Sequence, residues 1–141
     1  MNMISKEQLN QRGADKLPGH LGIVITKVGL DSVAGFLPVR TSLMAPNGYL
    51  HAGSIVTLAD TCAGYGCIAN LPAGANGFTT IELKSNHLGT TRNGHLDCTA
   101  SPVHIGKSTQ VWDAVVSHRE TGKTLALFRC TQMVLYPQGN T

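Results

Sequence analysis

The chain has 141 residues, of which 42% are hydrophobic and 13% are charged. Its charged fraction is well below the usual value of about 25%, which indicates that an oligomer covers part of the surface. The net charge of +3 is spread along the chain without a basic run, which argues against a nucleic-acid-binding protein. No run approaches the roughly 20 apolar residues of a membrane helix, and Lys6 and Glu7 interrupt any signal peptide. We therefore expect a cytoplasmic protein that binds neither nucleic acid nor membrane.

The length predicts one domain over residues 1–141, with residues 1–19 as an N-terminal helical extension. Ser5 is a good helix N-cap, and Gln8 stands three residues later at the position that completes a capping box. The helix that begins there is expected to stop before Pro18.

Two short β-rich runs follow, 21–28 and 32–39, and predict a hairpin. A loop over 41–50 leads to the segment 52–71, which is apolar on nearly every face. A helix that is apolar all round is a buried helix. Gly64 in this segment weakens the helix but lets another part of the chain approach it closely.

The rest of the chain is β-rich, and turn residues such as those at 91–94 and 120–123 divide it. The last three of its strands are expected to form a meander. This order predicts an α+β domain in which one antiparallel sheet wraps around one long helix. The predicted strands are 78–87, 95–105, 109–117 and 125–135.

Cysteines and histidines give no metal-binding pattern. The four cysteines form no C-x-x-C pair and the six histidines no H-x-x-x-H pair, so we expect no metal and no cofactor. We interpret the cysteines as small buried residues. They are Cys62, Cys67, Cys98 and Cys130.

Three segments carry a resemblance to a known family. The sequence Asn47-Gly-Tyr-Leu-His51-Ala-Gly runs directly into Ser-Ile-Val-Thr-Leu-Ala-Asp60. It resembles the N-x-x-x-H-G-G and L-A-[DE] signature of hotdog thioesterases, in the group of PaaI-like and Arthrobacter-type 4-hydroxybenzoyl-CoA thioesterases. Segments 80–87 and 104–112 resemble later parts of the family pattern, so that the match covers about residues 20–136.

The resemblance implies a hotdog fold and an acyl-CoA thioesterase. Such an enzyme hydrolyses a small or aromatic acyl-CoA to the free acid and coenzyme A, without a cofactor. The family also implies a homodimer that pairs into a homotetramer, with each active site between two subunits.

Ala52 and Asp60 are the central candidates for catalysis. Ala52 lies at the start of the predicted helix, where N–H groups have no helical partner and the helix end is partly positive. The resemblance implies that its N–H binds the oxyanion. An aspartate in an apolar helix is costly unless it is paired or functional. Asp60 is then a general base toward water, a nucleophile that forms a mixed anhydride, or a structural residue that accepts hydrogen bonds from a loop.

His51 and Asn47 complete the predicted catalytic set. His51 either orients the acyl carbonyl or fixes the loop before the helix through a backbone hydrogen bond. Asn47 either bonds the thioester or holds the Asn-Gly turn.

Three residues depart from the Arthrobacter-type pattern and favour the PaaI-like branch. Gly64 replaces a Ser or Thr one turn after the acid, Ala45 replaces a Gln, and the acid is Asp rather than Glu. The residue that holds the water is therefore not identified, and Thr61 and Tyr65 are candidates.

By resemblance, two strand ends are expected to bind the coenzyme A part of the substrate. Backbone N–H groups at glycines suit its phosphates. Lys107 and Arg92 are each either a cation for these phosphates or an ordinary charged turn residue. The predicted substrate-binding residues are Thr80, Asn86, His87, Leu88, Gly89, Thr90, His104, Ile105, Gly106, Lys107, Ser108 and Thr109.

Two alternative functions remain at this point. A non-catalytic acyl-CoA binding or sensor module would keep the pocket and have no use for Asp60. An enoyl or hydroxyacyl thioester hydratase would use an Asp-x-x-x-x-His pattern, which the sequence lacks.

Overall fold

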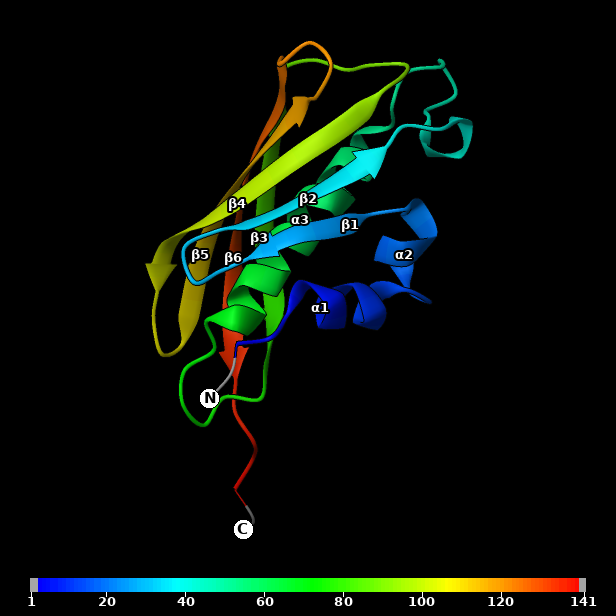
Figure 1. The fold of residues 1–141 in the computed structure, drawn as a ribbon. Coiled ribbons are helices and arrows are strands. Elements are labelled where there is room, and N and C mark those ends of the chain that lie inside the picture. Colours follow the sequence, from blue (N-terminus) through cyan, green and yellow to red (C-terminus); the bar gives the residue numbers. More distant parts are fainter. Residues whose placement is uncertain (1–2, 140–141) are drawn as a thin grey trace.

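The computed structural model describes residues 3–139. Figure 1 shows one curved sheet wrapped around one long helix, with two short helices beside the first strand. The elements in chain order are α1 (Lys6–Gly13), α2 (Leu17–Leu21), β1 (Val24–Val28), β2 (Val33–Pro38), a 3-10 turn (Thr41–Leu43), α3 (Ala52–Ala69), β3 (Gly77–His87), β4 (His95–Ile105), β5 (Thr109–His118) and β6 (Thr124–Leu135). The predicted α+β class and hotdog architecture are confirmed.

The N-terminal helix begins as predicted. Ser5 Oγ accepts from the Gln8 N–H at 3.1 Å, and Gln8 Oε1 accepts from the Ser5 N–H at 2.9 Å, so the capping box is complete. The helix ends at Gly13, before Pro18 as predicted. A second short helix, α2, was not predicted, and it contains that proline in its first turn. A proline suits this position, since the first N–H groups of a helix have no helical partner.

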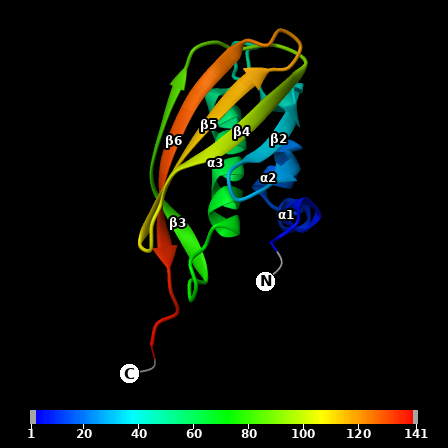
Figure 2. The ribbon, with the colours of Figure 1, turned by 60° about the vertical axis from the view of Figure 1, so that its left-hand side comes forward.

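The six strands form one antiparallel sheet in the order β1-β2-β4-β5-β6-β3. The predicted meander is confirmed, since β4, β5 and β6 are neighbours in sequence and in the sheet. Figure 2 shows α3 lying along the inner face of the sheet. Strands β1 and β3 are the two edges.

The two edges of the sheet differ. The side chain of Asn10 on α1 bonds both backbone groups of Ile25 in β1, donating to its carbonyl at 3.0 Å and accepting from its N–H at 2.8 Å. The N-terminal helix thus occupies hydrogen-bonding groups of one edge. The side chains of β3 are exposed or half-buried along its whole length, and Ile81 and Leu83 are among them. A bare edge of this kind offers backbone groups for pairing with another strand.

The core lies between α3 and the inner face of the sheet. Trp112 of β5 is fully buried, and a Cβ atom at Gly66 would lie 2.5 Å from its ring. The helix can therefore approach the sheet only with glycine at this position. All four cysteines are buried and free, as expected. Within residues 3–139 no helix is long and apolar enough to span a membrane.

Candidate active site

The start of α3 leaves one backbone donor free. His51 is the N-cap, and its ring Nδ1 accepts from the Gly53 N–H at 2.7 Å. The Ser54 N–H donates to the His51 carbonyl at 3.0 Å. Among the hydrogen bonds of the described residues, none uses the N–H of Ala52, which is exposed. The helix end therefore presents this N–H to a ligand, in the region where its dipole favours negative charge.

His51 fixes the start of the helix through a backbone hydrogen bond, which is one of the two roles predicted for it. Because Nδ1 accepts a hydrogen bond, a neutral ring carries its proton on Nε2. The ring is exposed, so this second nitrogen can still donate to a bound molecule.

Asn47 holds its own turn. Its Oδ1 accepts from the Tyr49 N–H at 3.0 Å, and Gly48 between them has φ = +84°, a value that glycine adopts without strain. The geometry matches the structural alternative for Asn47, although its amide nitrogen remains available.

Asp60 lies half-buried on α3, eight residues after Ala52. Its Oδ1 is buried and has no hydrogen-bond partner within residues 3–139. Burial raises the pKa of the Asp60 carboxyl above its ordinary value of 3.8. Within residues 3–139 no loop donates a hydrogen bond to this oxygen, which argues against the structural alternative for Asp60. An unpaired carboxylate with a raised pKa is what a general base requires.

Asp60 lies on the side of α3 that faces strand β3, because Gly64, one turn later on the same side, lies against Phe78 of β3. On the neighbouring strand β6, burial raises the pKa of the Cys130 thiol to about 12, and the Asp60 carboxylate adds to this shift. Cys130 is opposite Leu83 of β3. Asp60 thus points toward the side of the sheet that ends in the bare edge.

Gly64, one turn after Asp60, lies against the ring of Phe78. A Cβ atom at Gly64 would lie 2.9 Å from Cζ of Phe78 in β3. A Ser or Thr at this position, as in the Arthrobacter-type pattern, would require the half-buried Phe78 ring to shift, so this contact favours glycine.

Neither candidate for holding water is well placed. Tyr65 directs its hydroxyl toward α1, where a Cβ atom at Gly13 would lie 3.0 Å from it. Thr61 is buried. Successive helix residues lie about 100° apart around the axis, so Tyr65 also points well away from Asp60.

Ala52 and Asp60 of one chain are too far apart for one carbonyl. Eight residues of α-helix span about 12 Å at 1.5 Å per residue. A thioester carbon that contacts the Ala52 N–H therefore cannot also be attacked by a water on Asp60 of the same chain. A site between two subunits, which the resemblance implies, would not be limited by this separation.

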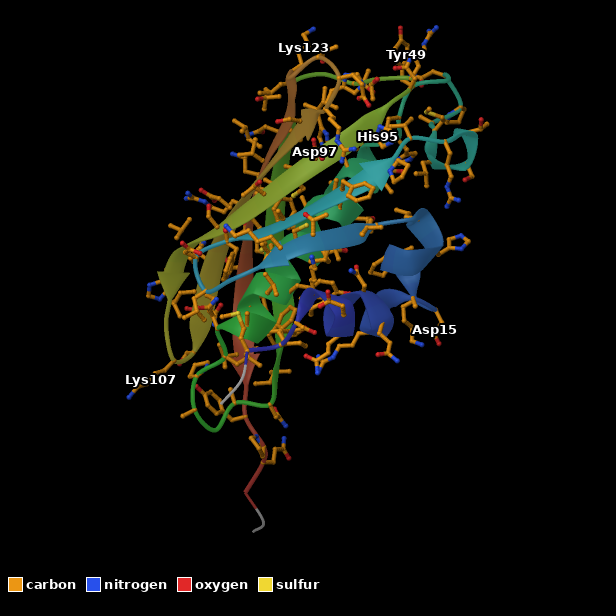
Figure 3. All side chains as sticks on the ribbon, viewed as in Figure 1. Asp15, Tyr49, His95, Asp97, Lys107 and Lys123 are labelled. Atoms are coloured by element: carbon orange, nitrogen blue, oxygen red, sulfur yellow. The ribbon has the colours of Figure 1, made fainter. Side chains whose placement is uncertain are left out.

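The structure divides the predicted substrate-binding residues between the two ends of the molecule. Leu88 and Gly89 donate backbone hydrogen bonds to Leu125, at the end that carries the α3 N-terminus, whereas Ser108 accepts from Val134 at the other end. Figure 3 shows Tyr49 and Lys123 at one end and Lys107 at the other. One chain therefore cannot use both groups for one substrate. The first group comprises Asn86, His87, Leu88, Gly89 and Thr90, and the second His104, Ile105, Gly106, Lys107, Ser108 and Thr109.

Thr80 lies between these groups on β3. It is on the inner face of the sheet, and its Oγ1 donates to Oε1 of the buried Gln132 at 2.6 Å. The lone pairs of the Thr80 hydroxyl remain free to accept from a water or a substrate.

Two features near the site were not predicted from the sequence. Ser85 on β3 has a buried hydroxyl oxygen that, like Asp60 Oδ1, has no hydrogen-bond partner within the described residues. The Arg92 guanidinium lies 4.1 Å from the centre of the Tyr49 ring, which joins the loop after β3 to the segment before α3. Neither has a signal in sequence spacing, since each depends on contacts between distant segments.

Comparisons with known proteins identify the family of this chain. The sequence profile of the thioesterase superfamily matches residues 47–125. The 1,4-dihydroxy-2-naphthoyl-CoA hydrolase of Listeria monocytogenes is 37% identical over 79% of this chain and 89% of its own length. The proofreading thioesterase EntH of Cronobacter sakazakii is 29% identical over 92% of this chain and 93% of its own. A crystal structure of a thioesterase from Haemophilus influenzae has a TM-score of 0.88 at 30% identity and covers 96% of this chain and 93% of that one.

A long apolar helix held by one six-stranded antiparallel sheet, with a carboxylate on the helix, defines a hotdog-fold protein. The profile match spans both Asn47 and Asp60, and the chain belongs to the thioesterase superfamily. It is a thioester hydrolase, like the relatives whose length it shares.

Proposed function

We propose that this enzyme hydrolyses an acyl-CoA, with Asp60 as the catalytic carboxylate and the Ala52 N–H as the oxyanion donor. The observation that carries the proposal is the unpartnered, half-buried Asp60 carboxylate in an otherwise apolar helix whose N-terminus keeps a free donor. A buried charged group without a partner costs folding free energy and is retained where it serves a function.

The active form is a homodimer that pairs through β3. Its bare edge and the exposed side chains of Ile81 and Leu83 support this, because the opposite edge already carries α1. Antiparallel pairing of two β3 strands lays the two α3 helices side by side in opposite directions. The Ala52 N–H of one subunit then approaches the Asp60 carboxylate of its partner. The separation of about 12 Å between these residues within one chain, roughly two helical turns, then no longer keeps them from acting on one carbonyl.

The same pairing brings together the two halves of the predicted coenzyme A site. The loop after β3 of one subunit lies at the end of the molecule where the partner has its β4–β5 hairpin. Lys107 of the hairpin supplies positive charge for a phosphate, and Gly89 of the loop keeps the backbone accessible. We assign both groups to one substrate on this basis.

The outer face of the sheet suits a further association into a homotetramer. Val115, Leu127 and Met133 expose apolar side chains there, around the ion pair between Arg129 and Asp113. The hollow between these strands, about 340 Å³, is shallow. We expect two dimers to meet on this face.

The reaction proceeds in one of two ways. As general base, Asp60 takes a proton from water while the water oxygen bonds to the thioester carbon. The oxyanion that forms accepts from the Ala52 N–H, the C–S bond breaks, and the proton on Asp60 passes to the leaving CoA thiolate. As nucleophile, Asp60 bonds to the acyl carbon while the C–S bond breaks and the CoA thiolate leaves to take a proton from water, and a second water then opens the anhydride. In a single turnover in ¹⁸O-water, label in the Asp60 carboxylate identifies the nucleophile, since the general base places the label in the released acid alone.

We propose an acyl group of the small or aromatic class and a position in the PaaI-like branch, which Asp60 together with Gly64 supports. The Listeria relative is named for a bicyclic aromatic acyl-CoA, so the test panel includes such a substrate. We expect the enzyme in the cytoplasm, where coenzyme A esters are made and used.

The test is thiol release, followed with a thiol-trapping dye, over a panel of acyl-CoA esters with wild type and Asp60→Asn. We expect turnover by wild type and a loss of about 10²–10⁴-fold in the variant. Binding of CoA without release from any ester would contradict the proposal and indicate the acyl-CoA sensor. Hydration of an enoyl-CoA would indicate the hydratase.

A further inference from the structure

Two histidines and a glutamate gather at the end of the sheet that carries the α3 N-terminus. His95 Nδ1 lies 2.6 Å from Oε1 of Glu120, and His118 Nε2 lies 3.3 Å from its Oε2. The hydrogen bond from His95 lowers the pKa of Glu120 to about 2, so this carboxylate is ionised. Figure 3 shows His95 toward the same end as Tyr49. These residues belong to no part of the site described above.

His118 is the buried member of the group, with 7% of its surface exposed. Its Nε2 lies 3.0 Å from the carbonyl oxygen of Asn93, and its Nδ1 lies 2.9 Å from the hydroxyl of Thr121. A carbonyl only accepts, so Nε2 carries a proton and donates to it. The ring thus ties the last strand position of β5 to residues 88–94, the loop between β3 and β4.

The loop 88–94 can come this close only because Gly94 has no side chain. A Cβ atom there would lie 2.7 Å from His118 Nε2 and 2.4 Å from Glu120 Oε2. Gly94 also has φ = +85°, which other residues rarely adopt. The side chains of His118 and Glu120 therefore leave no space for a side chain at position 94.

On its other side, the loop 88–94 holds the segment that leads into α3. The Thr91 carbonyl accepts from the Leu50 N–H at 3.0 Å. The Arg92 guanidinium stacks on the Tyr49 ring at 4.1 Å. Leu50 immediately precedes His51, the N-cap of the helix. A continuous series of contacts thus runs from the His118 ring through the loop to the start of α3.

We propose that His118 is a positioning residue for the thioester site, which places the Ala52 N–H by holding the loop 88–94 against Leu50. This inference rests on the proposed function of Ala52. An oxyanion donor must be held within about 0.5 Å of its working position, and a displacement of about 1 Å can cost roughly 100-fold in rate. The His118 ring touches neither Ala52 nor Asp60 and acts through the loop alone.

The test compares three variants. His118→Phe keeps the volume of the ring and removes the donor to Asn93, whereas His118→Gln puts an amide nitrogen near the position of Nε2 and restores it. Val116→Ala is the matched control, because it removes buried atoms from the same strand, at a position that pairs with Cys98 of β4 and Ala126 of β6. Hydrogen exchange of the Leu50 and Asn93 amides reports on the loop, and kcat and KM report on the site.

In His118→Phe we expect Leu50 and Asn93 to exchange at least about 10-fold faster, since local opening exposes amides without global unfolding. We expect kcat to fall about 10-fold with KM within about 2-fold, because the lost interaction acts in the transition state. His118→Gln should restore both, and Val116→Ala should change neither below its melting temperature.

Unchanged exchange in His118→Phe, or the same changes in Val116→Ala, would overturn the proposal. Faster exchange with unchanged kcat would also overturn it, because the loop would then not place the donor. A wild type that releases no thiol from any ester contradicts the proposed function instead, and the exchange measurement separates these two failures.

Discussion

The ring of Phe78 fills the space beside Gly64, so that a Cβ atom on this helix residue would lie 2.9 Å from the Phe78 Cζ. Gly66, two residues later, has the same relationship to the ring of Trp112 at 2.5 Å. The two glycines therefore fix how closely α3 approaches β3 and β5, and with it the position of Asp60.

Alanine at these two positions should have different effects. Gly→Ala inside an exposed helix stabilises by about 1 kcal/mol. Gly66→Ala should instead destabilise by about 1–3 kcal/mol, because the Trp112 ring is fully buried and cannot move aside. Gly64→Ala should cost less, since Phe78 is only half-buried. Urea unfolding of both variants measures this, and an equal or larger loss in Gly64→Ala would contradict the geometry.

Replacing Ala52 by proline removes one N–H and little else. Proline suits the first position of a helix, and His51 before it is already extended, with φ = −66° and ψ = 135°. Ala52→Pro should therefore stay folded and lose about 100-fold or more in kcat, the effect of one oxyanion donor.

Ala52→Gly is the control for this prediction, because it removes the methyl group and keeps the N–H. It should retain activity within about 10-fold of wild type. Full activity in Ala52→Pro would show that another donor binds the oxyanion.

Asp60→Asn should melt at a higher temperature than wild type at neutral pH. The raised pKa means that the folded protein binds this proton more tightly than the unfolded chain does. The contribution of the protonated Asp60 to stability is therefore fully present below the ordinary pKa of 3.8. It is lost as the pH rises through the higher pKa that Asp60 has in the folded protein. The uncharged amide avoids that loss, so the difference in melting temperature between the two proteins should shrink as the pH falls toward 3.8.

Thermal unfolding at several pH values checks this prediction. A lower melting temperature for Asp60→Asn at neutral pH would mean that the carboxylate has a stabilising partner in the assembled protein.

A positive charge on the bare edge should separate the subunits. Leu83→Lys places an ammonium group on β3, where the side chain is 44% exposed in one chain and covered in the proposed dimer. Sedimentation should show a species of half the wild-type mass, without thioesterase activity. Leu30→Lys changes a leucine that is 57% exposed, in the turn after β1, and should leave the mass unchanged. The wild-type mass in Leu83→Lys would place this interface elsewhere.

Local patterns in the sequence predicted most of the fold. Alternation and turn residues located β3 to β6 within about two residues, and the capping box located α1, because these signals lie within one element. The helix α2 was missed because Pro18 usually ends a helix, yet here it begins one. The pairing of β3 with β6 is a contact between distant segments, which local patterns do not predict.

The site was predictable in its residue types but not in its arrangement. The motif from Asn47 to Asp60 indicated where the chemistry lies. That the Ala52 N–H is free depends on how His51 bonds to Gly53. The separation of Leu88 from Lys107 depends on the topology of the sheet, which no spacing in the sequence reveals.

The most direct test of a site shared between two subunits is to mix two inactive variants. Asp60→Asn keeps the Ala52 N–H, and Ala52→Pro keeps the Asp60 carboxylate. After unfolding and refolding together, half of the dimers carry one of each, and each of these has one complete shared site. We predict recovery of about a quarter of the wild-type thiol release, as expected for a two-fold symmetric dimer. A mixture as inactive as its two components would contradict the shared site and place Ala52 and Asp60 of the same chain, or neither of them, at the reacting thioester.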